Sequence, residues 1–281
     1  YRERCPLVPA CGREGFLFTQ KGTGLTHSNN TDLFYDVIAE YYPYFYRDWE
    51  TQLEREGLGL RAIFRNQGVK RVLDASCGIG IQAVPLAQMG YEVVAADPSA
   101  GMLRKAHEIA EQYDVQDKIR FERANFLTLP EYVEGQFDAV VTKGTALPHL
   151  LYDDEIERAI KVFWDFLRPG GTLVIGMRDF GPFMESRPRF IPGFVHDIDE
   201  KGELITFEIW EWDDGPPLIA KQKLYIVQSD DGKRYTTKKR WVDFRPLSTD
   251  EVKVVLLEAG FVDYEDRAER TDRIIVTRKP L

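Results

Sequence analysis

The chain has 281 residues, of which 43% are hydrophobic and 30% are charged. This composition is typical of a folded globular protein, and the length predicts one large domain or a domain with an insertion. The 46 acidic residues outnumber the 37 basic ones, so a nucleic-acid backbone would be repelled on average. No stretch reaches the ~18 consecutive apolar residues of a membrane span, and the N-terminus lacks a signal-peptide pattern. We therefore expect a cytoplasmic protein whose partner is a small molecule, not a nucleic acid or a membrane.

Residues 1–67 are expected to form an N-terminal arm followed by helices that cover a site. Residues 1–30 show no periodicity and indicate an arm or loop. Apolar residues recur at helical spacing between Asp32 and Tyr41, with Asn30, Thr31 or Asp32 as cap, and a second helix is expected at 48–67. Three cysteines are too few for a disulfide framework, although a bridge between Cys5 and Cys11 stays open.

Strands and helices alternate over residues 68–180. The expected strands are 71–76, 92–97, 119–124, 137–143 and 172–178, and the expected helices are 80–89, 99–113 and 153–167. This alternation predicts a doubly wound α/β fold with a mostly parallel, Rossmann-like sheet whose ligands bind at the carboxyl ends of the strands.

Residues 181–247 contain a different pattern. Three β-rich segments are separated by turn sequences at 213–217 and 230–233, without a helix between them. We expect antiparallel hairpins inserted on the substrate side, where they could also support a homo-oligomer. Residues 248–281 then return to the core: a helix at 249–259, capped by Ser248 or Thr249 and ended by Gly260, and two strands that complete a seven-stranded sheet.

The strongest chemical signal is the run Val72-Leu73-Asp74-Ala75-Ser76-Cys77-Gly78-Ile79-Gly80. A buried strand enters a turn in which Gly78 and Gly80 let the backbone approach a ligand. Asp97 ends the next strand, where a carboxylate can accept both hydroxyls of a ribose. The pattern lacks the third glycine of a dinucleotide site, which disfavours NAD and FAD.

The order of these motifs resembles that of class I S-adenosylmethionine-dependent methyltransferases. The likeness extends through 97–103, 123–127, 137–140 and 167–173, and it implies S-adenosylmethionine as cofactor and S-adenosylhomocysteine as product. Within that class, 125–129, 144–150 and 175–180 resemble blocks of glycine and glycine/sarcosine N-methyltransferases. This closer resemblance implies N-methylation of an amino-acid-like amine.

The resemblance also implies roles for single residues. Asn125 and Phe126 would flank the adenine, Asp74 and Gly78 would lie under the methionyl group, and Arg47 would meet its carboxylate. The expected cofactor contacts are Asp74, Ala75, Cys77, Gly78, Gly80, Asp97, Pro98, Met102, Asn125, Phe126, Lys143, Tyr42 and Arg47.

The expected catalytic residues are His149, Arg178 and Tyr35. Arg178 would bind a substrate carboxylate through its planar, permanently charged fork, or would pair with Asp179 or another acid. His149 would act as a general base or would only hold its loop. Tyr35 would close over the sulfonium, or would pack as an ordinary helix residue.

Several alternatives remain at this stage. Thr145, preceded by Lys143, replaces the asparagine of the resembling family, which leaves the amino-acid acceptor open. O- or C-methylation of a natural-product or prenyl-type acceptor, and cofactor binding without catalysis, are the other hypotheses. Residues 143–148 lack the loop that binds a flipped base. Arg187 and Arg189 could bind an anion or lie in a solvated loop, and no Cys and His spacing indicates a metal site.

Overall fold

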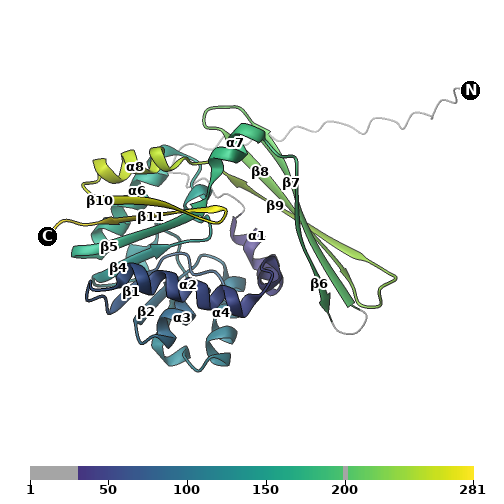
Figure 1. Ribbon diagram of the computed structural model, residues 1–281, viewed down its shortest axis with the longest axis horizontal. Coiled ribbons are helices and arrows are strands. Elements are labelled where there is room, and N and C mark those ends of the chain that lie inside the picture. The colour runs from purple at the N-terminus through teal and green to yellow at the C-terminus, as the bar shows by residue number, and fades with distance from the viewer. Residues whose placement is uncertain (1–30, 199–201) are drawn as a thin grey trace, which may run out of the picture.

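The computed structural model describes residues 31–198 and 202–281. The expected arm at residues 1–30, with Cys5, Cys11 and the cap candidate Asn30, lies outside the described residues. Two β-sheets and the helices around them make up the described part (Figure 1). None of its helices is long and apolar enough to cross a membrane.

The larger sheet has seven strands in the order β10-β11-β5-β4-β1-β2-β3. They are β1 (Arg71–Asp74), β2 (Glu92–Ala96), β3 (Ile119–Glu122), β4 (Phe137–Thr142), β5 (Leu167–Arg178), β10 (Val262–Glu269) and β11 (Asp272–Arg278). Strands β3, β2, β1, β4 and β5 run parallel to one another. Strand β11 pairs antiparallel with β5 on one side and with β10 on the other. The strand order reverses at β1, so a ligand crevice is expected beyond its carboxyl end. This topology confirms the predicted fold class.

Helices cover both faces of this sheet, as Figure 1 shows. On one face lie α2 (Trp49–Phe64), α3 (Ala83–Gln88) and α4 (Ala100–Gln112); on the other lie α5 (Leu129–Tyr132), α6 (Asp153–Phe166) and α8 (Thr249–Glu258). Short 3-10 turns are η2 (Gln116–Lys118) and η3 (Leu147–His149). Ser248 caps α8 by accepting a hydrogen bond from the Glu251 N–H, which decides between the two cap candidates.

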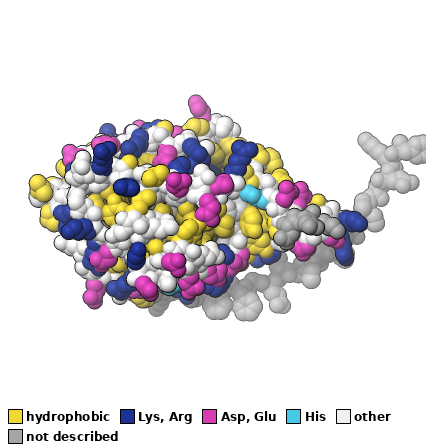
Figure 2. Space-filling view, turned by 60° about the horizontal axis from the view of Figure 1, so that its bottom comes forward, with side chains coloured by type: hydrophobic (Ala, Val, Ile, Leu, Met, Phe, Trp, Pro, Cys, Tyr) yellow, Lys and Arg dark blue, Asp and Glu magenta, His cyan; other side chains and the backbone are white. Residues whose placement is uncertain are grey.

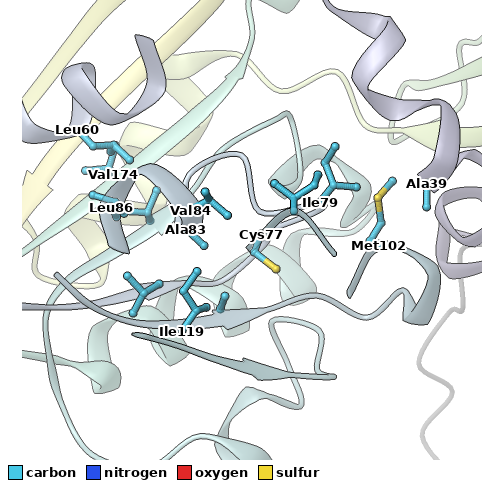
Figure 3. Packing of buried hydrophobic residues seen from close by; sticks show 14 of the residues in the cluster. Ala39, Leu60, Cys77, Ile79, Ala83, Val84, Leu86, Met102, Ile119 and Val174 are labelled. Atoms are coloured by element: carbon cyan, nitrogen blue, oxygen red, sulfur yellow. The ribbon is translucent and has the colours of Figure 1, made fainter. Parts of the chain in front are cut away.

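Successive residues of a strand point to opposite faces, so the central strands are apolar on both sides. In β1, Val72 packs under α2, α3 and α4, whereas Leu73 packs under α5, α6 and α8. Figure 3 shows the first cluster, to which α2 contributes Leu60, α3 Leu86 and α4 Met102. Burial of each such side chain contributes about 1.5–3 kcal/mol to the stability of the fold.

The second sheet is fully antiparallel and has the order β6-β7-β8-β9. Its strands are β6 (Phe190–Ile198), β7 (Gly202–Asp213), β8 (Ile219–Ser229) and β9 (Thr236–Phe244), and α7 (Phe180–Ser186) precedes them. Trp210, Leu224 and Phe244 point from this sheet into the same apolar cluster as Val72. The predicted hairpins are therefore present, packed against the core.

Arg187 and Arg189 lie in a short loop at residues 187–189, where both are exposed, as the solvated-loop prediction expects. The chain forms α7 and then β6, which pairs with β7 along Phe190–Ile198. Arg187, offered as an anion-binding residue, instead pairs with Asp214 at 2.6 Å. The carbonyl oxygen of Arg189 accepts a hydrogen bond from the Trp210 N–H.

The N-terminal helices pack against the edge of the larger sheet at which β1 and β2 end. α1 (Thr31–Ile38) continues into the 3-10 helix η1 (Ala39–Phe45), which contains Pro43. Asp36 of α1 accepts hydrogen bonds from the Ser99 hydroxyl (2.6 Å) and the Gly101 N–H (2.8 Å) at the start of α4. A Cβ atom on Gly101 would lie 2.7 Å from the carbonyl oxygen of Asp36. The two helices can approach this closely only because residue 101 has no side chain.

We expect Gly101→Ala to lower the free energy of unfolding by about 1–3 kcal/mol, because an added methyl group must push α1 from α4. Gly59→Ala is the matched control: Gly59 is also helical, no atom lies within 4 Å of an added Cβ, and the change should stabilise α2 by about 0.5–1 kcal/mol. Urea unfolding of both variants tests this. Equal stability of the two would contradict the packing argument.

Candidate functional site

A cavity of about 850 Å³ lies beyond the carboxyl ends of β1, β2 and β4. Its other walls come from α1, η1 and α2, from the second sheet, and from the turn between β10 and β11. Pockets of about 300–1,000 Å³ hold drug-sized ligands, so this volume is at the upper end of that range. On one face of the molecule, Figure 2 shows hydrophobic side chains gathered between charged ones.

Most of the residues expected from the sequence meet at this cavity. It is lined by Tyr35, Tyr42, Arg47, Ala75, Cys77, Gly78, Asp97, Pro98, Met102, Asn125, Phe126, Lys143, His149 and Arg178. Two expected cofactor contacts, Asp74 and Gly80, are not among the lining residues. The cavity thus brings together residues from both sheets and from the N-terminal helices.

The turn after β1 and the end of β2 are held together by one carboxylate. Asp97 accepts hydrogen bonds from the Gly78 N–H (2.9 Å) and the Ser99 N–H (3.0 Å), one on each oxygen. Gly78 has φ +52°, and no atom lies within 4 Å of an added Cβ, so its backbone faces open space. Burial raises the pKa of Asp97 to about 6, which leaves it ionised at neutral pH. Each oxygen keeps a lone pair that can accept a ribose hydroxyl.

Gly80 lies in a closely packed part of the turn. Its φ is +89°, and a Cβ would lie 3.1 Å from the side chain of Val84 and 3.7 Å from that of Ala106. The absent side chain therefore lets the turn lie against α3 and α4. Because Gly80 does not line the cavity, its expected contact with the cofactor stays a prediction.

Asp74 lies behind the cavity wall, fully buried. Neither carboxylate oxygen has a hydrogen-bond partner of normal geometry among the described residues, although the nearby Ser76 N–H lowers the pKa in part. Burial dominates and raises the pKa of Asp74 to about 8. A buried carboxylate without a partner is costly for the folded protein.

The wall expected to hold an adenine combines a fixed turn and an apolar surface. The side-chain oxygen of Asn125 accepts hydrogen bonds from the N–H groups of Leu127 and Thr128, both at 3.0 Å. Phe126 is buried and packs edge-on against Phe163, with ring centroids 5.2 Å apart. An aromatic ring flanked by a polar turn suits a flat, hydrogen-bonding heterocycle.

Lys143 does not offer a free charge to a ligand, because its ammonium group pairs with Glu56 of α2 at 2.5 Å. Both side chains are 8% exposed, and Gln52 and Gln82 donate further hydrogen bonds to Glu56. The sequence analysis missed Glu56, which is 87 residues away. Glu56 and Lys143 thus form a structural ion pair in the cavity wall.

Two arginines of the N-terminal helical region also line the cavity. Arg47, expected from the sequence, is exposed at the end of η1. Arg55 of α2 was missed: it also lines the cavity, and its buried Nε has no hydrogen-bond partner among the described residues. Guanidinium groups bind carboxylates in two-pronged geometry, so both can meet the carboxylate of a methionyl group.

Tyr35 and His149 form a hydrogen-bonded pair in the cavity wall. The Tyr35 hydroxyl is 2.8 Å from Nε2 of His149, and Nδ1 of His149 is 3.2 Å from the carbonyl oxygen of Asp243. The imidazole packs against Phe244, with centroids 4.2 Å apart. Burial lowers the pKa of His149 to about 4, so the ring is neutral at neutral pH.

Arg178 also lines the cavity, and its guanidinium lies over the rings of Phe183 (4.9 Å) and Trp210 (5.3 Å). Its Nη1 atom is 3.6 Å from Glu208 of β7. The alternative that Arg178 pairs with an acid is therefore present, but the acid is Glu208 and not Asp179, which caps α7 by accepting a hydrogen bond from the Gly181 N–H. Glu208 gave no signal of its own in the sequence.

The loop after β4 is held against β5. Thr145 has φ +67°, which is unfavourable for a β-branched residue. Its hydroxyl accepts a hydrogen bond from the Arg178 N–H, and its own N–H donates to the carbonyl of Gly176. Strained backbone of this kind is typical of functional sites.

In residues 31–198 and 202–281, no three His, Cys, Asp or Glu side chains are grouped so that they could hold a metal ion. The residues present do fit S-adenosylmethionine: an acid with free lone pairs for a ribose, an apolar wall for an adenine, and two arginines for a carboxylate.

Comparison with known sequences agrees with these features. Residues 72–171 match the protein family described as a methyltransferase domain. The glycine/sarcosine/dimethylglycine N-methyltransferase of Actinopolyspora halophila is 28% identical over 216 residues, which are 76% of this chain and 35% of that protein. The glycine/sarcosine N-methyltransferase of Halorhodospira halochloris is 26% identical, over 76% of this chain and 74% of that protein. The human glycine N-methyltransferase is 35% identical over 134 residues, 43% of this chain and 45% of that protein.

Solved structures show the same fold. An S-adenosylmethionine-dependent methyltransferase from Clostridium acetobutylicum matches with a TM-score of 0.68 and 16% identity, over 88% of this chain and 99% of that one. CalS10, an amino pentose methyltransferase from Micromonospora echinaspora solved with its cofactor bound, matches with a TM-score of 0.64 and 20% identity, over 86% and 96%. The resemblance expected from the sequence is confirmed.

We expect Asp74→Asn to stabilise the protein in the absence of ligand, in a pH-dependent way. A raised carboxyl pKa stabilises the fold while the group keeps its proton, and this contribution is lost as the pH rises from the unfolded value of 3.8 to about 8. The advantage of the variant should therefore grow over this range by at least about 2 kcal/mol, since one pKa unit corresponds to about 1.4 kcal/mol. Urea unfolding at pH 5 and pH 8 measures it. A difference that does not change with pH would show that Asp74 is not the titrating group.

Proposed function

We propose that this S-adenosylmethionine-dependent methyltransferase methylates the amine nitrogen of a small, amino-acid-like molecule. The observation that carries the proposal is one cavity whose wall includes the cofactor turn, with Gly78 and Asp97, and also Tyr35 and Arg178. The relatives named for glycine and sarcosine support an amine as acceptor. As expected from the sequence, the proposal takes the acceptor to be a small molecule and the protein to be a cytoplasmic homo-oligomer.

When bound, the cofactor supplies an electrophilic methyl group on a positively charged sulfur. The protein residues then bind and align the two reactants and keep water out, because an in-line displacement depends on orientation. Asp97 would fix the ribose, Arg47 and Arg55 would hold the methionyl carboxylate, and Arg178 would hold the acceptor. The aromatic rings of Tyr35 and Tyr42 would surround the sulfonium charge.

Cofactor binding is the first test. Calorimetry should show binding of S-adenosylmethionine and S-adenosylhomocysteine and none of NAD. Labelled cofactor with amines, phenols, carboxylates and prenyl diphosphates then separates N-methylation from O- or C-methylation. Failure to bind S-adenosylhomocysteine removes the proposal, whereas binding without transfer to any component of a cell extract favours a non-catalytic binding protein.

We expect Asp97→Ala to weaken cofactor binding at least tenfold. Two charge-assisted hydrogen bonds contribute about 1.5–3 kcal/mol, and 1.4 kcal/mol is a factor of ten. Glu122→Ala is the control, because Glu122 ends the neighbouring strand β3 without lining the cavity. Unchanged affinity of Asp97→Ala, or an equal loss in the control, would refute the ribose assignment.

We expect Arg178→Lys to lower kcat/KM for a carboxylate acceptor by tenfold or more while cofactor affinity stays nearly unchanged. Lysine keeps the charge but loses the two-pronged geometry. Arg187→Lys is the control, since Arg187 pairs with Asp214 and does not line the cavity. The acceptor and its amide are compared in parallel, and equal losses for both would show that Arg178 only balances Glu208.

A further inference from the structure

The side chain of Arg178 is held by ring contacts and charge, not by hydrogen bonds. Its guanidinium lies 4.9 and 5.3 Å from the ring centroids of Phe183 and Trp210. Its Nη1 atom is 3.6 Å from Oε2 of Glu208, which is within the range of an ion pair but beyond that of a hydrogen bond. Among the residues that the structure describes, no protein group accepts a hydrogen bond from this guanidinium. Its N–H groups are therefore available to a ligand in the cavity.

The carboxylate of Glu208 is fixed by Trp210. Nε1 of Trp210 donates a hydrogen bond to the same Oε2 atom at 2.7 Å. The indole is 1% exposed and stacks on Phe244, with ring centroids 5.7 Å apart and an interplanar angle of 25°. If the carboxylate moved away, this buried N–H would lose its partner, which is costly. The negative charge of Glu208 is thus held beside the positive charge of Arg178.

The two charges offset each other for a ligand that binds the free N–H groups of Arg178. Only 27% of the Arg178 side chain and 19% of the Glu208 side chain are exposed, so solvent screens their fields only in part. A carboxylate gains two directed hydrogen bonds from the guanidinium, while Glu208 repels it from further away. A doubly charged group loses more hydration than a carboxylate when it enters the cavity. The paired charges leave little net field to compensate that loss.

We propose that Glu208 is a specificity-determining residue, which restricts the acid group bound by Arg178 to a single negative charge. The inference rests on the proposed function, in which Arg178 holds the acceptor, and adds a residue that selects among acceptors. An amine with a carboxylate is accepted because its geometry matches the guanidinium. An amine with a doubly charged phosphonate or phosphate group is rejected, because the pair of Arg178 and Glu208 offers it no net positive charge.

The wild-type test uses three amines that differ in one group: glycinamide, glycine and aminomethylphosphonate. Near neutral pH this group carries zero, one and two negative charges, respectively. The affinity of each amine is measured by calorimetry with S-adenosylhomocysteine bound, so that no methyl transfer occurs. We expect glycine to bind at least tenfold more tightly than either of the other two. Binding of aminomethylphosphonate as tight as that of glycine overturns the proposal.

Glu208→Gln removes the charge and keeps an oxygen that can accept the Trp210 N–H. Electrostatic repulsion scales with the charge of the ligand, so the free-energy gain for a doubly charged group is twice that for a carboxylate, and its fold-change is the square. We expect glycine to bind about fivefold and aminomethylphosphonate about 25-fold more tightly than in the wild type, with glycinamide unchanged. Equal changes for all three amines would indicate a merely structural role. That result, or no gain for aminomethylphosphonate, overturns the proposal.

Glu203→Gln is the matched control. Glu203 lies on the same strand, β7, but its carboxylate accepts a hydrogen bond from the Tyr235 hydroxyl at 3.0 Å, and it does not line the cavity. This variant should leave all three affinities unchanged. If it changes them as much as Glu208→Gln does, the effect comes from the net charge of the sheet and the proposal is overturned.

The inference and the proposed function fail on different results. Absence of S-adenosylhomocysteine binding contradicts the proposed function itself. If S-adenosylhomocysteine binds but none of the three amines binds to the wild type or to Glu208→Gln, only the inference is overturned, because Glu208 then does not select among amines held by Arg178. If Glu208→Gln does not fold, the wild-type order of affinities still tests the proposal.

Discussion

The site depends on one buried carboxylate, that of Asp97, which joins the turn after β1 to the start of α4 through the N–H groups of Gly78 and Ser99. Ser99 extends this contact. Its hydroxyl accepts from the Met102 N–H as the cap of α4 and donates to Asp36 of α1. The acid assigned to the ribose, the helix cap and the N-terminal helix thus belong to one hydrogen-bond network. A shift of α1 would therefore also move the residues that would bind the cofactor.

Other polar contacts across the cavity also join parts of the chain that are distant in sequence. Glu56 of α2 pairs with Lys143 after β4, and Glu208 of the second sheet faces Arg178 at the end of β5. Buried ion pairs contribute little net stability because both partners lose hydration. Removing one partner of the buried Lys143–Glu56 pair is costly, however, so this pair favours the arrangement in which α2 packs against the end of β4.

The sequence predicts what is determined locally and misses what depends on distant contacts. Gly78 and Asp97 could be found because backbone approach and a strand-end acid leave local patterns. The sequence analysis assigned no strand to β6, which contains Pro192; proline is tolerated in an edge strand, where half of the N–H groups lack a strand partner. Asp179 was offered as a partner of Arg178, but it follows the last residue of β5 and caps α7 instead. Glu208 lies 30 residues away on the second sheet and comes close to Arg178 only in the folded chain.

The electrostatics of the cavity favour alignment over acid–base catalysis. Burial lowers the pKa of His149 to about 4 and raises that of Tyr35 well above its usual value. Neither group exchanges protons readily near neutral pH, where general bases are most effective when their pKa is close to the working pH. This disfavours the general-base role first considered for His149. Methyl transfer does not need such a base if the amine arrives with its lone pair free, because the displacement then depends on the alignment of the two reactants.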